Sequence, residues 1–134
     1  MNRVHAILVT DLVGFSALMK REGVLAAVEV VEHMRARATT AVTAAGGLLV
    51  KFVADNTFSV FPDILSAIAA ARELGSVHSI GAGVGFGEVY LPPGDLWGVE
   101  VNLAAKLGED EAGPGDILLT VAAQKEGRLS RAAL

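Results

Sequence analysis

The sequence predicts an α+β fold of the ferredoxin-like type, a βααββαβ core with helices packed on one face of a mainly antiparallel sheet. Three observations support this prediction. Short β-branched apolar runs alternate with longer segments whose apolar residues recur every three or four positions, and glycine or proline stands at most boundaries. In chain order, the segments are predicted to be strand, helix, helix, strand, strand, helix, strand, helix, strand and helix.

The first third of the chain predicts one strand and two helices. Residues 3–10 form a short apolar run that ends in Asp-x-x-Gly, as expected for a buried strand. Residues 15–21 are predicted to form a short helix that Gly23 stops. Residues 24–45 carry an apolar stripe at helical spacing, and Gly46-Gly47 ends this long amphipathic helix.

The middle of the chain predicts a hairpin followed by a helix. Residues 48–53 and 57–61 are apolar runs separated by Ala-Asp-Asn, and the pair Asp55-Asn56 favours a tight turn. A helix is expected over residues 62–74, after a Pro-Asp start.

The last third begins with an unusual strand at residues 80–90. Glycine occupies every second position from 81 to 87, so one face of this strand lacks side chains and allows close packing or strong curvature. A helix over 99–107, a strand over 116–120 and a short helix over 121–125 are expected to follow.

Composition narrows the class of protein. A chain of 134 residues suits a single domain, residues 1–134, and 52% apolar with 19% charged residues excludes disorder. The absence of cysteine excludes disulfides and thiolate sites. A net charge of −4 without a basic stripe argues against nucleic-acid binding. The sequence has no apolar run long enough for a membrane segment and no signal-peptide pattern, so we expect a cytoplasmic protein.

Two aspartates are the first candidate site. Asp11 and Asp55 each lie at the edge of a predicted buried strand, where an ionised carboxylate is costly unless a cation meets it. Two such carboxylates at one place suggest a divalent metal that serves phosphate chemistry. The backbone amides of Leu12, Val13, Gly14 and Phe15 precede a helix and could bind phosphate. The alternative is that Asp11 only caps that helix.

Four short blocks follow one another between Val4 and Gln124. They are Asp11-x-x-Gly14-Phe15-Ser16, Gly46-Gly47-x3-Lys51-x3-Asp55-x5-Phe61, Gly81-x-Gly83-x3-Gly87-x-Val89, and Asp95-Leu96-Trp97-Gly98-x3-Asn102-x-Ala104-Ala105-Lys106-Leu107. In this order the blocks resemble the catalytic domain of class III nucleotidyl (adenylyl/guanylyl) cyclases. The resemblance implies that Asp11 and Asp55 bind two divalent metal ions, Mg²⁺ or Mn²⁺.

The resemblance also implies a nucleotide. Lys51 and Asp95 match the positions that read the purine, and a Lys/Asp pair resembles the adenylate cyclases. Lysine can donate to a ring nitrogen of adenine, and a carboxylate can accept from its 6-amino group. The alternatives are an ordinary strand lysine that reaches solvent and an ordinary Gly-Asp turn.

Two residues of the predicted helix 99–107 complete the set implied by the family. Asn102 matches the asparagine that orients the ribose, with an exposed polar residue as the alternative. Lys106 stands where the family has an arginine that stabilises charge on the α-phosphate. Lysine keeps the charge but lacks the two-donor fork, so a slower reaction is expected. Ala54 stands where the family has glycine, a change that we expect to be tolerated with a negative φ.

The resemblance implies a head-to-tail homodimer that converts ATP to cyclic AMP and pyrophosphate. Asp11 and Asp55 would come from one subunit, and Lys51, Asp95, Asn102 and Lys106 from the other. The alternative is a degenerate module that binds nucleotide or only dimerises. The family's later hairpin carries a lysine for the β- and γ-phosphates, and Lys125 and Arg128 lie too early to match it.

Three other features receive no catalytic role from the sequence. His5, His33 and His78 are not expected to form a site, and the acidic run 109–111 is expected to be a solvated helix end. Trp97 is expected to pack at a subunit interface.

Overall fold

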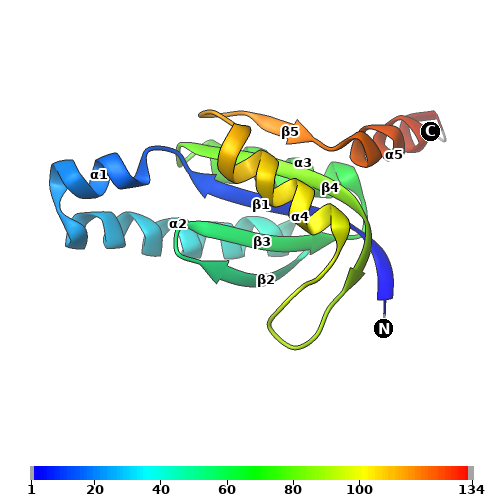
Figure 1. Cartoon of the computed structure of the whole chain (residues 1–134), viewed down its shortest axis with the longest axis horizontal. Helices are drawn as coiled ribbons and strands as arrows, with labels where there is room; N and C mark the ends of the chain where they lie inside the picture. The colour runs from blue at the N-terminus through cyan, green and yellow to red at the C-terminus, as the bar shows by residue number, and fades with distance from the viewer. Residues whose placement is uncertain (1, 133–134) are drawn as a thin grey trace.

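The computed structural model describes residues 2–132, and its centre is a mixed sheet (Figure 1). In the described range the sheet has five strands in the order β2-β3-β1-β4-β5, all neighbours antiparallel except β4 and β5. The strands are β1 (Asn2–Leu12), β2 (Leu48–Val53), β3 (Asn56–Phe61), β4 (Ile80–Tyr90) and β5 (Ile117–Leu119). The predicted α+β class and the mainly antiparallel sheet are confirmed.

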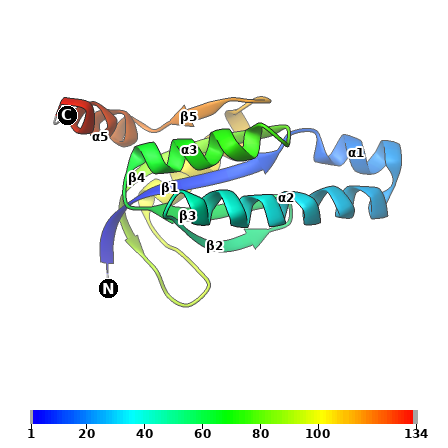
Figure 2. The same cartoon turned by 180° about the vertical axis from the view of Figure 1, so that it is seen from behind.

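Helices cover both faces of the sheet, as the two opposite views in Figures 1 and 2 show. The prediction of helices on one face holds for α2 and α3, whereas α4 and the π-helical turn η1 lie on the other face. The helices are α1 (Phe15–Glu22), α2 (Val24–Ala44), α3 (Ile64–Gly75), α4 (Val99–Lys106), η1 (Leu107–Glu111) and α5 (Val121–Ala132). The last helix extends beyond the predicted range 121–125.

Strand β1 is buried on both sides because the two helical layers enclose it. Ala6 and Leu8 point to the α3 side and pack with Ala67. Ile7 and Val9 point to the opposite side, into the cluster that contains Val101 and Ala104 of α4. Alternate residues of one strand therefore supply both cores, which explains why residues 6–9 of β1 are all apolar.

The glycines of β4 let α4 and η1 lie directly on the strand. A Cβ at Gly83 would collide with the carbonyl oxygen of Ala104, and one at Gly85 would lie 2.7 Å from that of Glu100. A Cβ at Gly81 would lie 2.8 Å from Ala112. The close packing that the glycine pattern predicted is confirmed, and its partner is the helix that carries two candidate site residues.

Helix α1 and the first turns of α2 extend beyond the end of the sheet in both views (Figures 1 and 2). Gly23, with φ of 94°, joins the two helices, and Val24 and Leu25 beside it are exposed. Within residues 2–132, no helix has the length and apolar character needed to cross a membrane.

Candidate active site

The structure brings the two predicted metal-binding aspartates together. Asp11, near the end of β1, is paired across the sheet with Asn56, the first residue of β3. Asp55 occupies the turn just before Asn56, and its side chain shares a hydrogen bond with that of Asp11. The short turn between β2 and β3 therefore places the second carboxylate beside the first.

This pair of carboxylates is electrostatically unfavourable without a cation. Burial raises the pKa of Asp11 to about 8, with further contributions from the hydrogen bond and the charge of Asp55 and from the charges of Glu109 and Asp110. The pKa of Glu109 is raised as well, mainly by burial and then by Asp110 and Asp55. The negative charges of Asp55, Glu109 and Asp110 all act on Asp11, and this field favours a bound positive charge.

The turn that presents Asp55 has an unusual conformation. Ala54 has φ of 53°, so the negative φ under which alanine would be tolerated here is not present. A left-handed alanine costs roughly 1 kcal/mol because its Cβ approaches the following carbonyl oxygen. Arg35 of α2 holds the turn: its Nη2 donates to the Ala54 carbonyl oxygen at 2.7 Å, and its guanidinium lies 5.0 Å from the Phe52 ring centre.

The donor set fits Mg²⁺ or Mn²⁺. These ions prefer carboxylate oxygens, and Mg²⁺ is commonly held by one or two carboxylates together with substrate phosphates. Asp11 and Asp55 provide such a pair. Among the described residues, no group of three or more histidine, aspartate or glutamate side chains is placed to hold an ion. Any metal bound here therefore needs ligands from a substrate or from water.

The predicted phosphate loop connects β1 to α1. Gly14 has φ of 78° and is the N-cap of α1, without a side-chain hydrogen bond, so Asp11 does not cap this helix. Leu12 is buried, and the Val13 amide donates to the carbonyl oxygen of Ser79 at 2.9 Å. The Val13 amide is thus already paired, and a phosphate would rely on the amides closer to Phe15 at the helix start.

Lys51 and Asp95 form an ion pair with each other. The Lys51 Nζ lies 2.8 Å from Oδ1 of Asp95, and the same oxygen accepts from the Leu96 amide at 2.8 Å. These two hydrogen bonds, the one from Lys51 first, lower the pKa of Asp95. Backbone hydrogen bonds between Tyr90 and Trp97 close the loop that carries Asp95.

Asn102 and Lys106 lie on the outer face of α4. Both side chains are exposed, and within the part of the chain that the structure describes neither makes a hydrogen bond or ion pair. Val99, which is 76% exposed, and Leu103, which is 44% exposed, share this face at helical spacing. The opposite face of α4 is buried on β4. The outer face is thus an uncovered mixture of apolar and polar groups.

Known proteins resemble the chain in sequence and fold, although no protein-family model matches it. An adenylate cyclase from Streptomyces coelicolor is 32% identical over 113 residues, which are 79% of this chain and 30% of that protein. The chain thus spans less than a third of this curated relative. The crystal structure of an adenylate/guanylate cyclase/hydrolase from Silicibacter pomeroyi is 26% identical with a TM-score of 0.78, covering 100% of this chain and 83% of that one.

The adenylyl cyclase CyaB from P. aeruginosa has the same fold, with a TM-score of 0.81 at 17% identity over 96% of this chain and 82% of that chain. The sequence match and the shared fold support a cyclase catalytic domain. This cyclase domain therefore carries its acidic pair and its outer α4 face on a known catalytic fold.

The cyclase domain also contains site residues that the sequence did not reveal. The acidic run 109–111 is an exposed helix end, as expected, and in addition Glu109 and Asp110 act electrostatically on Asp11. The turn η1 continues α4 across β4, where Gly108 packs against the Val9 carbonyl oxygen. In the sequence, only Gly108 and its spacing from Lys106 could have indicated that η1 lies across β4. Nothing in the local sequence indicated that Arg35 holds the turn of Asp55.

Proposed function

We propose that the chain is an adenylate cyclase domain that converts ATP to cyclic AMP and pyrophosphate in the cytoplasm, at sites shared between two subunits of a homodimer. The observation that carries this proposal is the meeting of Asp11 and Asp55 at the sheet end, where the burial of Asp11 and the charge of Asp55 favour a bound cation. The family relationship supplies the reaction class.

Adenine recognition is assigned to Lys51 and Asp95. Their mutual ion pair orients both groups and uses only Oδ1 of Asp95. Oδ2 remains as the acceptor for the 6-amino group, and the remaining N–H donors of Lys51 can reach a ring nitrogen. This arrangement favours adenine over guanine, which presents a carbonyl oxygen at the same position.

The outer face of α4 is assigned to the partner's half of the site. An exposed helix face that combines Val99 and Leu103 with Asn102 and Lys106 is suited to an interface. In a head-to-tail dimer with twofold symmetry, each α4 can face the other subunit's Asp11 and Asp55, which gives two composite sites. Trp97, 63% exposed beside α4, extends this interface.

The reaction is an in-line displacement. The ribose 3′-oxygen forms a bond to the α-phosphorus, the bond to the pyrophosphate oxygen breaks, and the hydroxyl proton is released to solvent. Bound Mg²⁺ or Mn²⁺ would promote ionisation of the 3′-hydroxyl and offset the triphosphate charge. Asp11 and Asp55 would hold the metal ion. Asn102 orients the ribose, and Lys106 places one positive charge at the α-phosphate.

A direct assay tests the proposal. The purified protein is incubated with ATP and Mn²⁺, and cyclic AMP is measured beside an Asp55→Ala variant. We expect product from the wild type only, and less product from GTP than from ATP. Absence of cyclic nucleotide above the variant's background would contradict the proposal.

A second candidate is a cyclase-like module that binds nucleotide or dimerises without turnover. Lys106, which lacks the two-donor fork of arginine, and the Val13 amide, which is already bonded to Ser79, favour it. Binding of ATP by wild type and Asp55→Ala, without product from either, would select this alternative. Sedimentation adds a separate check, because a protein that stays monomeric with ATP and metal cannot form composite sites.

A further inference from the structure

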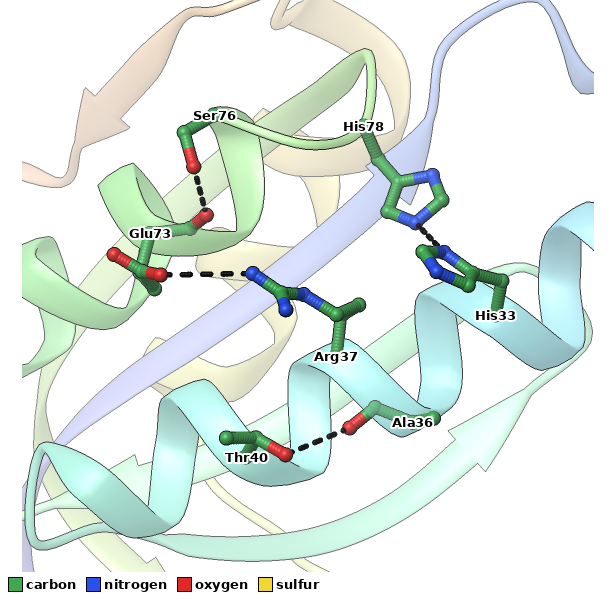
Figure 3. Close-up of polar contacts among 7 residues, drawn as sticks. All are labelled: His33, Ala36, Arg37, Thr40, Glu73, Ser76 and His78. Carbon is green, nitrogen blue, oxygen red and sulfur yellow. Dashed lines mark hydrogen bonds and ion pairs between the residues drawn. The ribbon is translucent and has the colours of Figure 1, made fainter.

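His33 and His78 meet on the surface, far apart in sequence and on the α2–α3 side of the sheet (Figure 3). His33 lies on α2, and His78 lies in the short connection between α3 and β4. Nδ1 of His33 and Nε2 of His78 are 2.8 Å apart, and the ring centres are 4.9 Å apart with planes at 57°. His33 is exposed and His78 is half-buried, so solvent reaches the pair.

The surroundings leave these imidazoles available as ligands. Arg37, one helical turn after His33, directs its guanidinium toward Glu73 at 3.7 Å, as Figure 3 shows. Glu73 thereby offsets the positive charge of Arg37, which acts on His78. Burial, followed by the charges of His33 and Arg37, lowers the pKa of His78. His78 is therefore neutral at pH 7, and a neutral imidazole has the lone pair that a metal requires.

We propose that His33 and His78 form a two-histidine binding site for a divalent transition metal of the Ni²⁺, Cu²⁺ or Zn²⁺ type. Nδ1 of His33 and Nε2 of His78 are the ligands, and water fills the other positions. Metal–nitrogen bonds of about 2.0–2.1 Å at octahedral or tetrahedral angles place two nitrogens about 2.9–3.4 Å apart. The present separation of 2.8 Å needs only a small widening.

Metal binding requires one hydrogen to move between the two nitrogens of one ring, and no proton leaves the histidine pair. In the hydrogen-bonded state one ring donates its N–H to the lone pair of the other. Metal binding moves that hydrogen to the outer nitrogen of the same ring, so both facing nitrogens present lone pairs and a neutral pair releases no proton. The two outer nitrogens, Nε2 of His33 and Nδ1 of His78, then both carry hydrogen.

The metal would connect two elements that border the phosphate loop. Residue 79, next to His78, accepts the hydrogen bond from the Val13 amide. A link between α2 and this connection would therefore stabilise the backbone that holds Val13. Imidazole ligands select the transition metals and carboxylates select Mg²⁺, so this site is chemically distinct from Asp11 and Asp55. The inference does not depend on adenylate cyclase activity.

Calorimetric titration of the full chain with NiCl₂ in excess Mg²⁺ tests the proposal, because Mg²⁺ occupies the carboxylates. We expect one Ni²⁺ per chain, and an affinity at least about tenfold lower in His33→Ala and in His78→Ala, each of which retains one imidazole. The matched control is His5→Ala, since His5 lies on β1 and its Nδ1 lies 3.2 Å from the carbonyl oxygen of Arg3. Its affinity should equal that of the wild type.

Nuclear magnetic resonance of the imidazole nitrogens supplies a readout that needs no variant. In the wild type, Zn²⁺ should shift the signals of His33 Nδ1 and His78 Nε2 and leave those of His5 unchanged. Equal Ni²⁺ affinity in all three alanine variants would overturn the proposal. The proposal would also be overturned if Zn²⁺ left the nitrogen signals of His33 and His78 unchanged. The same holds if Asp55→Ala abolished Ni²⁺ binding and the histidine substitutions did not.

Discussion

The two halves of the candidate active site differ in how far one subunit completes them. Asp11 and Asp55 are already in contact, and Arg35 of another element holds their turn. Asn102 and Lys106, in contrast, project from α4 without a partner in the described chain. One half is built by the fold of a single chain, whereas in the proposed homodimer the other is presented to a second copy. If that proposal holds, catalytic competence depends on assembly more than on folding.

Complementation between two inactive variants is the strongest way to break this comparison. Asp55→Asn removes a carboxylate from one half, and Asn102→Ala removes a group from the other. If sites are shared, an equal mixture contains heterodimers with one intact site, and about a quarter of wild-type cyclic AMP production returns from two nearly inactive proteins. Activity is measured before and after mixing and exchange of subunits.

The control for this experiment mixes Asp55→Asn with Asp11→Asn, which removes residues from the same half. Neither site of that heterodimer is complete, so activity should stay at background. Absence of recovery in the first mixture would show that a single chain supplies all the groups. Recovery in the control mixture would show that Asp11 and Asp55 of one site come from different subunits.

The pH dependence of the free energy of unfolding tests the electrostatics of the half of the site that Asp11 and Asp55 form. Because the pKa of Asp11 is raised to about 8 from 3.8, the folded state holds this proton more tightly than the unfolded state. The free energy of unfolding of the metal-free protein should therefore fall as pH rises from about 4 to about 8. Asp11→Asn should remove this decline and raise the melting temperature at pH 8.5 by several degrees.

Thermal unfolding at pH 5 and pH 8.5 provides the measurement. Mn²⁺ should raise the melting temperature of the wild type at pH 8.5 and have little effect on Asp11→Asn. Glu29→Gln, on the exposed side of α2, serves as the charge-matched control and should follow the wild type. Identical pH profiles of wild type and Asp11→Asn would refute the electrostatic account.

Lys106→Arg sharpens the comparison from the other half. Arginine adds a planar fork of donors for phosphate oxygens, so cyclic AMP production should rise by about tenfold, mainly in kcat. Stability should not change, because Lys106 is exposed and makes no described contact. Steady-state kinetics and urea unfolding of both proteins measure the two quantities. A lower kcat in the arginine variant would mean that Lys106 does not face the phosphate.

Ala54→Gly should have the smallest effect. Glycine removes the strain of the left-handed residue but increases the entropy of the unfolded chain, and the net stabilisation should be about 0.5–1 kcal/mol. Urea unfolding measures it. Ala36→Gly, on the exposed face of α2, should destabilise by about 1 kcal/mol and serves as the opposite control. Destabilisation by both changes would contradict the positive φ at Ala54.

The elements themselves were largely predictable because their signals are local. Apolar spacing located the long helix α2, and the Asp55-Asn56 pair located the turn between β2 and β3. The glycines of β4 predicted close packing, but they could not say which element packs there. Burial of α4 against β4 decides the second helical layer, and this is a long-range contact with no local signature.

The candidate site was predictable only in part, for the same reason. Matching motifs identified Asp11, Asp55, Lys51 and Asp95, which the structure brings together in two pairs. The contributions of Arg35, Glu109 and Asp110 come from elements distant in sequence. The contact between His33 and His78 was missed for this reason too, since 45 positions separate the two residues.

The bare face of β4 has a consequence for how this molecule can move. Side chains normally act as a deformable layer between a helix and a sheet, and rotamer changes let the two slide. Between α4 and β4 that layer is absent, because backbone carbonyls of Ala104 and Glu100 rest against Gly83 and Gly85. The outer face of α4 is therefore fixed to the sheet that carries Asp11, and in the proposed homodimer opening or closing of the shared site would come from rotation of whole subunits.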